Sequence, residues 1–293
     1  MTEFRHPRSA PQGREEPELV RVPLDAPRPL WARLTAPAGP PAPCLASRAG
    51  ANVLALPGLY CVTYLILGPD SVLVVDIGSG ADHARIIDAL AWLGRPSQQV
   101  RTVLPTHLHM DHVIGIDAFA RRLGVPVTLG EGAHESVTLG RRLRFPSGLH
   151  TLRAIPTYLM QGAPRAPLGD FGRGLGFGFP WSRNRFEAVL APALEHGAAL
   201  PWVPGWSVLH TPGHADDAIC LYHEAARFLI AGDTVRNFWG GEWNPLACDH
   251  AAYRRSKALL GSLAVETVFP GHGPIVQGER VIERLRTLPR FMP

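Results

Sequence analysis

The sequence predicts a mixed α+β domain that follows a proline-rich N-terminal arm. Apolar runs of strand length recur from residue 52 to the end, and segments with helical periodicity separate them. By contrast, ten of the first 50 residues are proline. A chain of 293 residues with 46% hydrophobic residues can bury the core of one large domain or two modest ones.

Residues 1–50 are expected to form an extended arm that wraps the domain or stays partly disordered, because proline fixes φ and removes a backbone donor. The arm mixes charges with prolines and lacks the apolar core of a signal peptide. The cysteines form no C-x-x-C pair, which favours free thiols in a reducing compartment, so we expect a cytoplasmic protein. They are Cys44, Cys61, Cys220 and Cys248.

The domain is expected to span residues 51–293 and to open with strands. Two apolar runs, 52–56 and 60–67, surround a Pro-Gly turn, and a third run, 71–78, completes a hairpin with the second. The first two runs together lack charged residues, as a membrane span does. The turn between them favours two strands, and we expect no membrane anchor.

A β-loop-α-β unit is expected after a helix over residues 81–94. Its first strand covers 100–106, its helix covers 112–124 and ends at a glycine, and its second strand covers 125–130. The loop between the first strand and the helix carries a cluster of histidines. This loop is therefore the first candidate for a functional site.

Residues 141–205 show no regular pattern. Within them lies an insertion at about 155–182, in which the segment Gly169–Trp181 contains five glycines interleaved with phenylalanines. A mobile surface insertion is the simpler interpretation. The functional interpretation is a lid at the substrate entrance, because glycines permit motion and aromatic rings offer apolar contact.

Regular patterns return after residue 205. Three closely spaced strands are expected first, followed by a helix, a strand and a final helix. They cover residues 206–210, 218–223, 227–233, 250–263, 265–271 and 278–288.

The stretch "VRTVLPTHLHMDHVIG" places three histidines and an aspartate within six positions. His107 and His109 are two residues apart, so their side chains share one side if the segment stays extended. Asp111 and His112 follow where the loop becomes a helix. Such crowding costs stability unless something compensates the repulsion and desolvation, and a metal ion is the natural compensator.

Three later strands also end abruptly in a side chain that can bind metal. "SVLHTPGH" ends in His214, "RFLIAGD" in Asp233 and "VETVFPGH" in His272. Because strand-end loops collect at one edge of a sheet, these groups can converge with the first cluster. Five imidazoles and two carboxylates suit two divalent ions of the zinc type.

These motifs, T-H-x-H-x-D-H, T-P-G-H, G-D and P-G-H-G-P, together resemble the metallo-β-lactamase superfamily of metallohydrolases, and within it the lactonase and glyoxalase II-like branch. The resemblance runs from about Asn52 to the end, except for residues 141–205. It implies a four-layer αββα sandwich with two mixed β-sheets and helices outside. It also implies that Asp76, at the end of an early strand, supports the ligand loop.

The resemblance assigns a role to each candidate ligand. One metal would be bound by His107, His109 and His214, the other by Asp111, His112 and His272, with Asp233 bridging the two. We expect zinc, with iron or manganese as alternatives. A hydroxide held between the ions would attack the substrate, and Asp111 would orient this nucleophile and shuttle a proton.

Departures from known branches narrow the expected substrate. Asp233 and the lack of an export signal disfavour a β-lactamase, and His109 stands where flavin-linked diiron relatives have glutamate. The chain ends about twenty residues after His272, which makes a glutathione thioester doubtful. What remains is a small ester, lactone or thioester of apolar character.

Three alternatives stay open. They are a phosphodiesterase or nuclease, a mononuclear iron oxygenase resembling persulfide dioxygenase, and a non-catalytic metal-binding module. A net charge of +4 with scattered arginine pairs does not indicate a nucleic-acid surface, so the expected partner is a small molecule. Arg236, Trp239 and Trp243 either line the substrate mouth or pack in the core, and no pattern indicates the oligomeric state.

Overall fold

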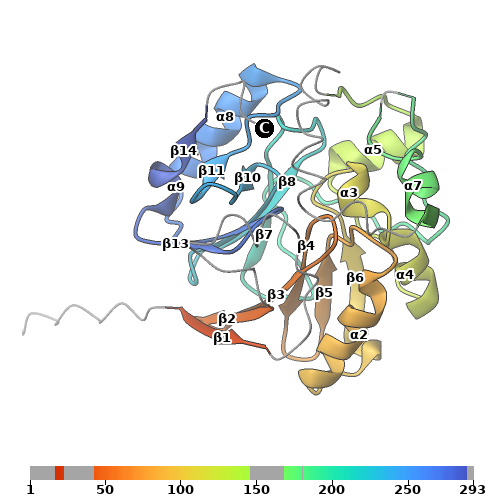
Figure 1. The fold of residues 1–293 in the computed structure, drawn as a ribbon, viewed down its shortest axis with the longest axis horizontal. Coiled ribbons are helices and arrows are strands. Elements are labelled where there is room, and N and C mark those ends of the chain that lie inside the picture. The colour runs from red at the N-terminus through yellow and green to blue at the C-terminus, as the bar shows by residue number, and fades with distance from the viewer. Residues whose placement is uncertain (1–16, 23–42, 146–167, 180, 289–293) are drawn as a thin grey trace, which may run out of the picture.

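Two β-sheets pack face to face, with helices on both outer surfaces (Figure 1). The computed structural model describes residues 17–22, 43–145, 168–179 and 181–288. Helices α2 (Asp82–Trp92) and α4 (Ile116–Leu123) cover one surface, and α8 (His250–Gly261) and α9 (Val281–Arg284) cover the other. This order of layers is the αββα sandwich expected from the sequence.

The first sheet has six strands in chain order, antiparallel up to β5, with β6 parallel to β5. The strands are β1 (Glu18–Arg21), β2 (Cys44–Arg48), β3 (Ala51–Pro57), β4 (Val62–Leu67), β5 (Val72–Val75) and β6 (Val100–Leu104).

The arm expected over residues 1–50 contributes two of these strands. Both β1 and β2 lack proline, so every residue in them keeps the backbone N–H that a sheet ladder needs. The sheet therefore begins before residue 51. The other residues of the arm, apart from Pro17, Val22, Pro43, Ala49 and Gly50, lie outside the described ones.

The segment after β6 differs from the expected unit in two ways. Its helix is interrupted, because α3 (Met110–Val113) ends before Gly115, whose N–H donates to the Ile77 carbonyl. The strand expected at 125–130 forms only isolated bridges, in which Val127 pairs with Val103 and Leu190. Pro126 has no N–H to donate, which prevents a regular ladder there. Helix α5 (Glu131–Leu139) follows.

The second sheet has the strand order β13-β12-β9-β8-β7, in which β9 and β12 are parallel and the other pairs antiparallel. Helix α8 begins after Asp249, whose side chain accepts from the backbone N–H groups of Ala251 and Ala252. The strands are β7 (Trp206–His210), β8 (Ile219–His223), β9 (Phe228–Gly232), β12 (Thr267–Pro270) and β13 (Val276–Gln277).

The final helix is shorter than the expected span of 278–288. Only Val281–Arg284 is helical, because Leu285 is extended and the next two residues form β14 (Arg286–Thr287). Strand β14 pairs with β11 (Glu242–Trp243), which pairs in turn with β10 (Val235–Arg236). Tertiary pairing here prevails over helical periodicity.

Three hydrophobic clusters fill the spaces between the four layers. Along β3, Leu54 and Leu56 join the cluster that contacts the first helices, whereas Val53 and Ala55 join the cluster between the sheets. A third cluster lies between the second sheet and α8. This alternation follows from the two-residue period of a strand with both faces buried.

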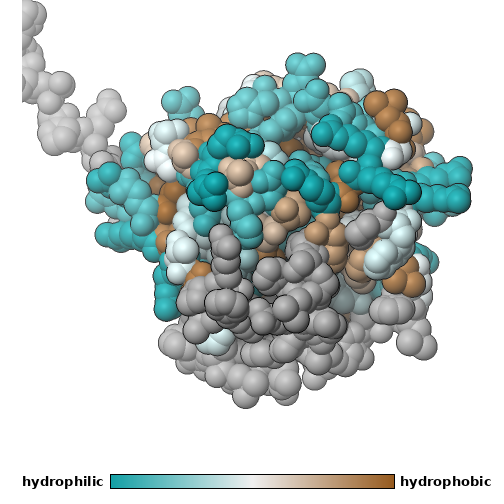
Figure 2. Space-filling view, turned by 90° about the horizontal axis from the view of Figure 1, so that it is seen from above, coloured by the Kyte–Doolittle hydropathy of each residue, from teal (hydrophilic) through white to brown (hydrophobic). Residues whose placement is uncertain are grey.

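No helix among the described residues is long and apolar enough to cross a membrane. Figure 2 looks onto the face that lies uppermost in Figure 1. On the described part of that face, hydrophilic side chains predominate and hydrophobic ones are scattered between them (Figure 2).

Candidate metal centre

The structure brings all seven candidate ligands together at one edge of the sandwich, between the two sheets. The loop after β6 and helix α3 supply four of them, and the loops after β7, β9 and β12 supply one each. They divide into two groups, and within each group the potential ligand atoms lie within 4.8 Å of one another. The groups are His107, His109 and His214, and Asp111, His112, Asp233 and His272.

The first group consists of imidazoles alone. His214 Nε2 lies 3.0 Å from His109 Nδ1, and the His107 ring is 4.5 Å from His109 and 5.1 Å from His214. His107 Nε2 is buried and has no hydrogen-bond partner in the described part of the chain. A buried nitrogen that lacks a partner is costly, and a metal ion would supply one.

The second group joins carboxylates to imidazoles. His272 Nε2 lies 3.3 Å from Asp111 Oδ2 and 3.1 Å from Asp233 Oδ1. His112 Nε2 lies 3.2 Å from the same oxygen of Asp233. Nitrogen and carboxylate oxygen together form a donor set typical of zinc, iron and manganese.

Asp233 lies between the two groups. Its Oδ1 faces the second group, and its Oδ2 lies 3.4 Å from His214 Nε2 in the first. Gly271 makes this arrangement possible, because a Cβ there would meet Asp233 Oδ1 and would lie 3.0 Å from His112 Cε1. The Asp233 carboxylate can therefore provide one oxygen to each group.

Outer hydrogen bonds orient the site. Asp76, which is fully buried, accepts from the backbone N–H of Thr106 at 2.7 Å and faces His112 Nδ1 at 2.9 Å. His214 Nδ1 likewise faces the Leu246 carbonyl at 2.8 Å. In both imidazoles the outer nitrogen has a fixed partner, so Nε2 is directed into the site.

One supporting residue was missed from the sequence. Asp217 is buried, and its Oδ2 accepts from the backbone N–H of Leu108 at 2.8 Å, which holds the loop between His107 and His109. It lies three residues after His214, but nothing in the sequence separates it from the adjacent Asp216. Only the packing of the β7–β8 loop against the ligand loop identifies it.

The two groups differ in electrostatic character. Burial, reinforced by the neighbouring imidazoles, lowers the pKa of His107 well below its usual value and that of His109 to about 3. For Asp111, burial opposes ionisation, but His112 and His272 outweigh it and lower the pKa to about 2. Neutral imidazoles and ionised carboxylates are the forms that bind metal.

Aromatic rings lie beside the first group. Phe145 makes an edge contact with His109 at 5.5 Å between ring centroids, and Phe179 lies 5.1 Å from Phe145. Gly178 must be glycine, because a Cβ there would lie 2.8 Å from His109 Cα and its φ is +73°. The described part of the insertion is thus at the same edge as the ligands, whereas residues 155–167 and 180 lie outside the described ones.

The residues after Asp233 divide between the site and the core. Phe238 stacks on His272 at 6.0 Å, whereas Trp243 is buried and packs against Tyr253. Arg236 is buried, with its Nε 3.4 Å from Glu242 Oε1. Trp243 therefore packs in the core, whereas the Arg236 guanidinium lies 5.3 Å from the Phe238 ring, and Trp239 is about half exposed.

Two curated proteins are similar to this chain in sequence, and a solved structure is similar to it in fold. The probable metallo-hydrolase YqjP of Bacillus subtilis (strain 168) is 26% identical over 242 residues, which cover 76% of this chain and 70% of that protein. The acyl-coenzyme A thioesterase MBLAC2 of Gallus gallus is 26% identical over 226 residues, 74% of each chain. A metallo-beta-lactamase family protein from Thermus thermophilus has a TM-score of 0.54 at 26% identity, covering 81% of this chain and 78% of its own.

The fold, the paired groups of candidate ligands and these relatives define a metal-dependent hydrolase. The profile of the metallo-beta-lactamase superfamily matches residues 56–272, about three quarters of the sequence. The chain belongs to the metallo-β-lactamase superfamily.

Proposed function

We propose that this chain hydrolyses small esters, lactones or thioesters with an apolar acyl arm, at a pair of divalent metal ions. The observation that carries the proposal is the set of aromatic rings beside the two groups of ligands, namely Phe145 and Phe179 on one side and Phe238 on the other. The arginines next to these rings along the chain already have acidic partners, since Arg144 pairs with Asp216 and Asp249, and Arg236 is buried beside Glu242. An apolar acyl group is favoured at such a surface over an ionic phosphate, whose oxygens require donors.

The proposal assigns His107, His109 and His214 to one ion, and Asp111, His112 and His272 to the other. Asp233 would be shared by the two ions, because its two oxygens face different groups. When bound, such a pair polarises a carbonyl oxygen and lowers the pKa of a water towards neutrality. Zinc is the expected metal, with iron and manganese as alternatives.

The chain itself supplies positioning and proton transfer. Asp111 is buried within the second group, with its Oδ2 3.3 Å from His272 Nε2, so its carboxylate is placed to orient the nucleophile and accept a proton from it. The same carboxylate can return that proton to the leaving alkoxide or thiolate. Phe145 and Phe238 hold the apolar arm and exclude water from the reacting carbonyl.

A substrate panel combined with metal analysis tests this function. Protein purified without chelator should contain close to two equivalents of metal, one for each group of ligands. It should hydrolyse an aryl ester, a lactone or a neutral thioester faster than bis(p-nitrophenyl) phosphate. Faster turnover of the phosphodiester would establish a phosphodiesterase instead, and a single equivalent dominated by iron would establish the oxygenase.

Removing one aromatic ring should separate substrate binding from chemistry. Phe179→Ala is expected to raise KM for an apolar aryl ester by about 3- to 10-fold while kcat changes little, because the Phe179 ring contacts the rings of Phe145 and Trp181 and is not a candidate ligand. Trp92→Ala, which removes a partly exposed ring at the end of α2, should leave both constants unchanged. If Phe179→Ala instead lowered kcat by a similar factor and left KM unchanged, a binding role for this ring would be contradicted.

A further inference from the structure

A groove with several arginines lies next to the aromatic residues of the site. Its volume is about 640 Å³, within the range of pockets that hold small molecules. The end of α5 and the residues after it form one wall, and the segment from Trp181 to Leu190 forms the other. The arginines are Arg141, Arg142, Arg183 and Arg185.

Most of this positive charge has no acidic partner in the part of the chain that the structure describes. Arg141 pairs with Glu135, but no carboxylate pairs with Arg142, Arg183 or Arg185 among the described residues. Four guanidinium groups around one groove repel one another, and an anion with several oxygens would relieve that repulsion. Phosphate is the anion best matched to the planar, multiply donating guanidinium group.

The groove also offers an aromatic surface. Trp181 lines it, and 69% of its surface is exposed, so one ring face is open to a ligand. The Trp181 ring also stacks on Phe179, with 4.8 Å between the ring centroids and an interplanar angle of 7°. Arginines beside an exposed indole form a combination that recognises phosphates together with a heterocyclic base.

A continuous series of ring contacts connects the groove with the metal centre. Trp181 stacks on Phe179, Phe179 contacts Phe145, and Phe145 contacts His109. Asn184 fixes the intervening loop, because its Oδ1 accepts from Gly178 N–H and its Nδ2 donates to Ser136 Oγ, both at 2.9 Å. One molecule with a long arm can therefore occupy both places.

We propose that this groove binds the phosphate-bearing nucleotide arm of an acyl thioester whose carbonyl carbon lies at the metal centre. The inference rests on the proposed function and selects one substrate class within it. A thioester on a long thiol arm can follow the series of rings and place its phosphates in the groove while its carbonyl carbon lies at the metal centre. Water adds to the carbonyl carbon, the C–S bond breaks, and the thiolate takes a proton, so the products are a carboxylic acid and a free thiol.

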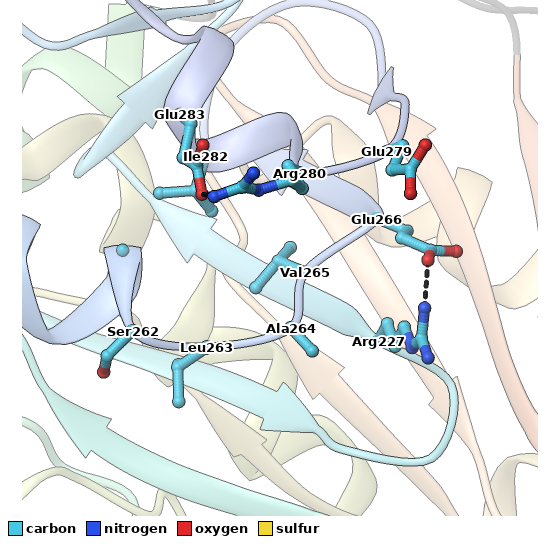
Figure 3. A pocket seen from close by; sticks show the side chains of 11 residues that line it. Arg227, Ser262, Leu263, Ala264, Val265, Glu266, Glu279, Arg280, Ile282 and Glu283 are labelled. Atoms are coloured by element: carbon cyan, nitrogen blue, oxygen red, sulfur yellow. Dashed lines mark hydrogen bonds and ion pairs between the residues drawn. The ribbon is translucent and has the colours of Figure 1, made fainter.

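A second cavity does not compete as a ligand site. It has a volume of about 390 Å³ and lies at the opposite ends of β9 and β12 from Asp233 and His272 (Figure 3). Its arginines are already neutralised, since Arg227 pairs with Glu266 and Arg280 pairs with Glu283 (Figure 3).

The test compares two thioesters that carry the same acyl group. Butyryl coenzyme A has the phosphorylated arm, and S-butyryl-N-acetylcysteamine lacks it. The double variant Arg183→Ala/Arg185→Ala should raise the KM for butyryl coenzyme A, relative to the KM for S-butyryl-N-acetylcysteamine, by at least about 10-fold. The reason is that bonds to a charged group are lost for butyryl coenzyme A only. Arg254→Ala/Arg255→Ala, on the exposed surface of α8, removes the same charge elsewhere and should leave the ratio unchanged.

Calorimetric titration of the full chain with coenzyme A measures the affinity of the groove for the nucleotide arm in the absence of catalysis. The Arg183→Ala/Arg185→Ala variant should bind it at least about 10-fold more weakly, by the loss of the same bonds. Unchanged affinity and an unchanged KM ratio would overturn the groove assignment while leaving thioester hydrolysis in place. Failure to hydrolyse either thioester while an aryl ester or a lactone is still turned over would overturn the thioester assignment and leave the proposed function in place. Failure to hydrolyse any of these substrates would overturn the proposed function, and the titration would still decide whether the groove binds the nucleotide arm. Tighter binding of single-stranded RNA than of coenzyme A at these arginines would also overturn the assignment.

Discussion

Replacing Asp233 by alanine should remove most of the metal from both groups of ligands and lower hydrolysis by more than about 100-fold. Residues that only support metal ligands cost about 10- to 100-fold when removed, and Asp233 is placed as a ligand shared by both ions. Metal content measured by elemental analysis should fall well below one equivalent. The change deletes a carboxylate at the end of β9 and no part of the hydrophobic clusters, so circular dichroism should retain the wild-type spectrum.

His134→Ala provides the matched control. His134 lies in α5 and belongs to neither group, so its removal should change neither metal content nor rate. Asp233→Asn keeps the size of the side chain but removes its charge, and it should lose metal nearly as completely as the alanine variant. If His134→Ala releases metal as effectively as Asp233→Ala, the ligand assignment is wrong.

Phe269→Ala should lower the free energy of unfolding by about 3–5 kcal/mol, the usual cost of deleting a fully buried aromatic ring. Phe269 is completely buried in the cluster between the sheets, where its ring makes edge contacts with Tyr64 at 5.6 Å and Phe228 at 5.2 Å. Because Tyr64 belongs to the first sheet and Phe228 to the second, the cavity would weaken the contact between them. Urea unfolding at pH 7 measures the change.

Val189→Ala serves as the comparison for stability. Val189 is 75% exposed, so its substitution should change the free energy of unfolding by less than about 0.5 kcal/mol. A loss of unfolding free energy below about 1 kcal/mol for Phe269→Ala would show that burial of this ring contributes little to the packing of the two sheets. The contact between Tyr64 and Phe269 would then not hold the sandwich together.

Elements with a complete local pattern were predictable. The helix expected over 81–94 is α2, and the runs at 52–56 and 60–67 are β3 and β4. Their patterns agree with their tertiary environment, since the alternating faces of each strand are both buried. Local preference and global packing indicate the same conformation in these elements.

Elements that depend on a distant partner were predicted less well. Strand β14 forms because residues 286–287 pair with 242–243, and this pairing cannot be inferred from the periodicity of 278–288. Strand β1 has two adjacent apolar residues, Leu19 and Val20, and no alternation, so only its pairing with β2 defines it. Backbone hydrogen bonds to a remote segment carry no signature in the local sequence.

The sequence by itself determined the superfamily, the sandwich and the set of candidate ligands, because strand-end motifs with metal-binding residue types recur in a fixed order. That these seven residues bind metal stays a prediction, although the structure places them in two adjoining groups. Tertiary structure alone decided that Asp233 faces both groups, that Asp217 holds the ligand loop and that arginines surround a groove beside Trp181. The physical reason is that residue type limits which bonds a side chain can form, whereas the distance and direction of its partners arise only when separate segments pack together.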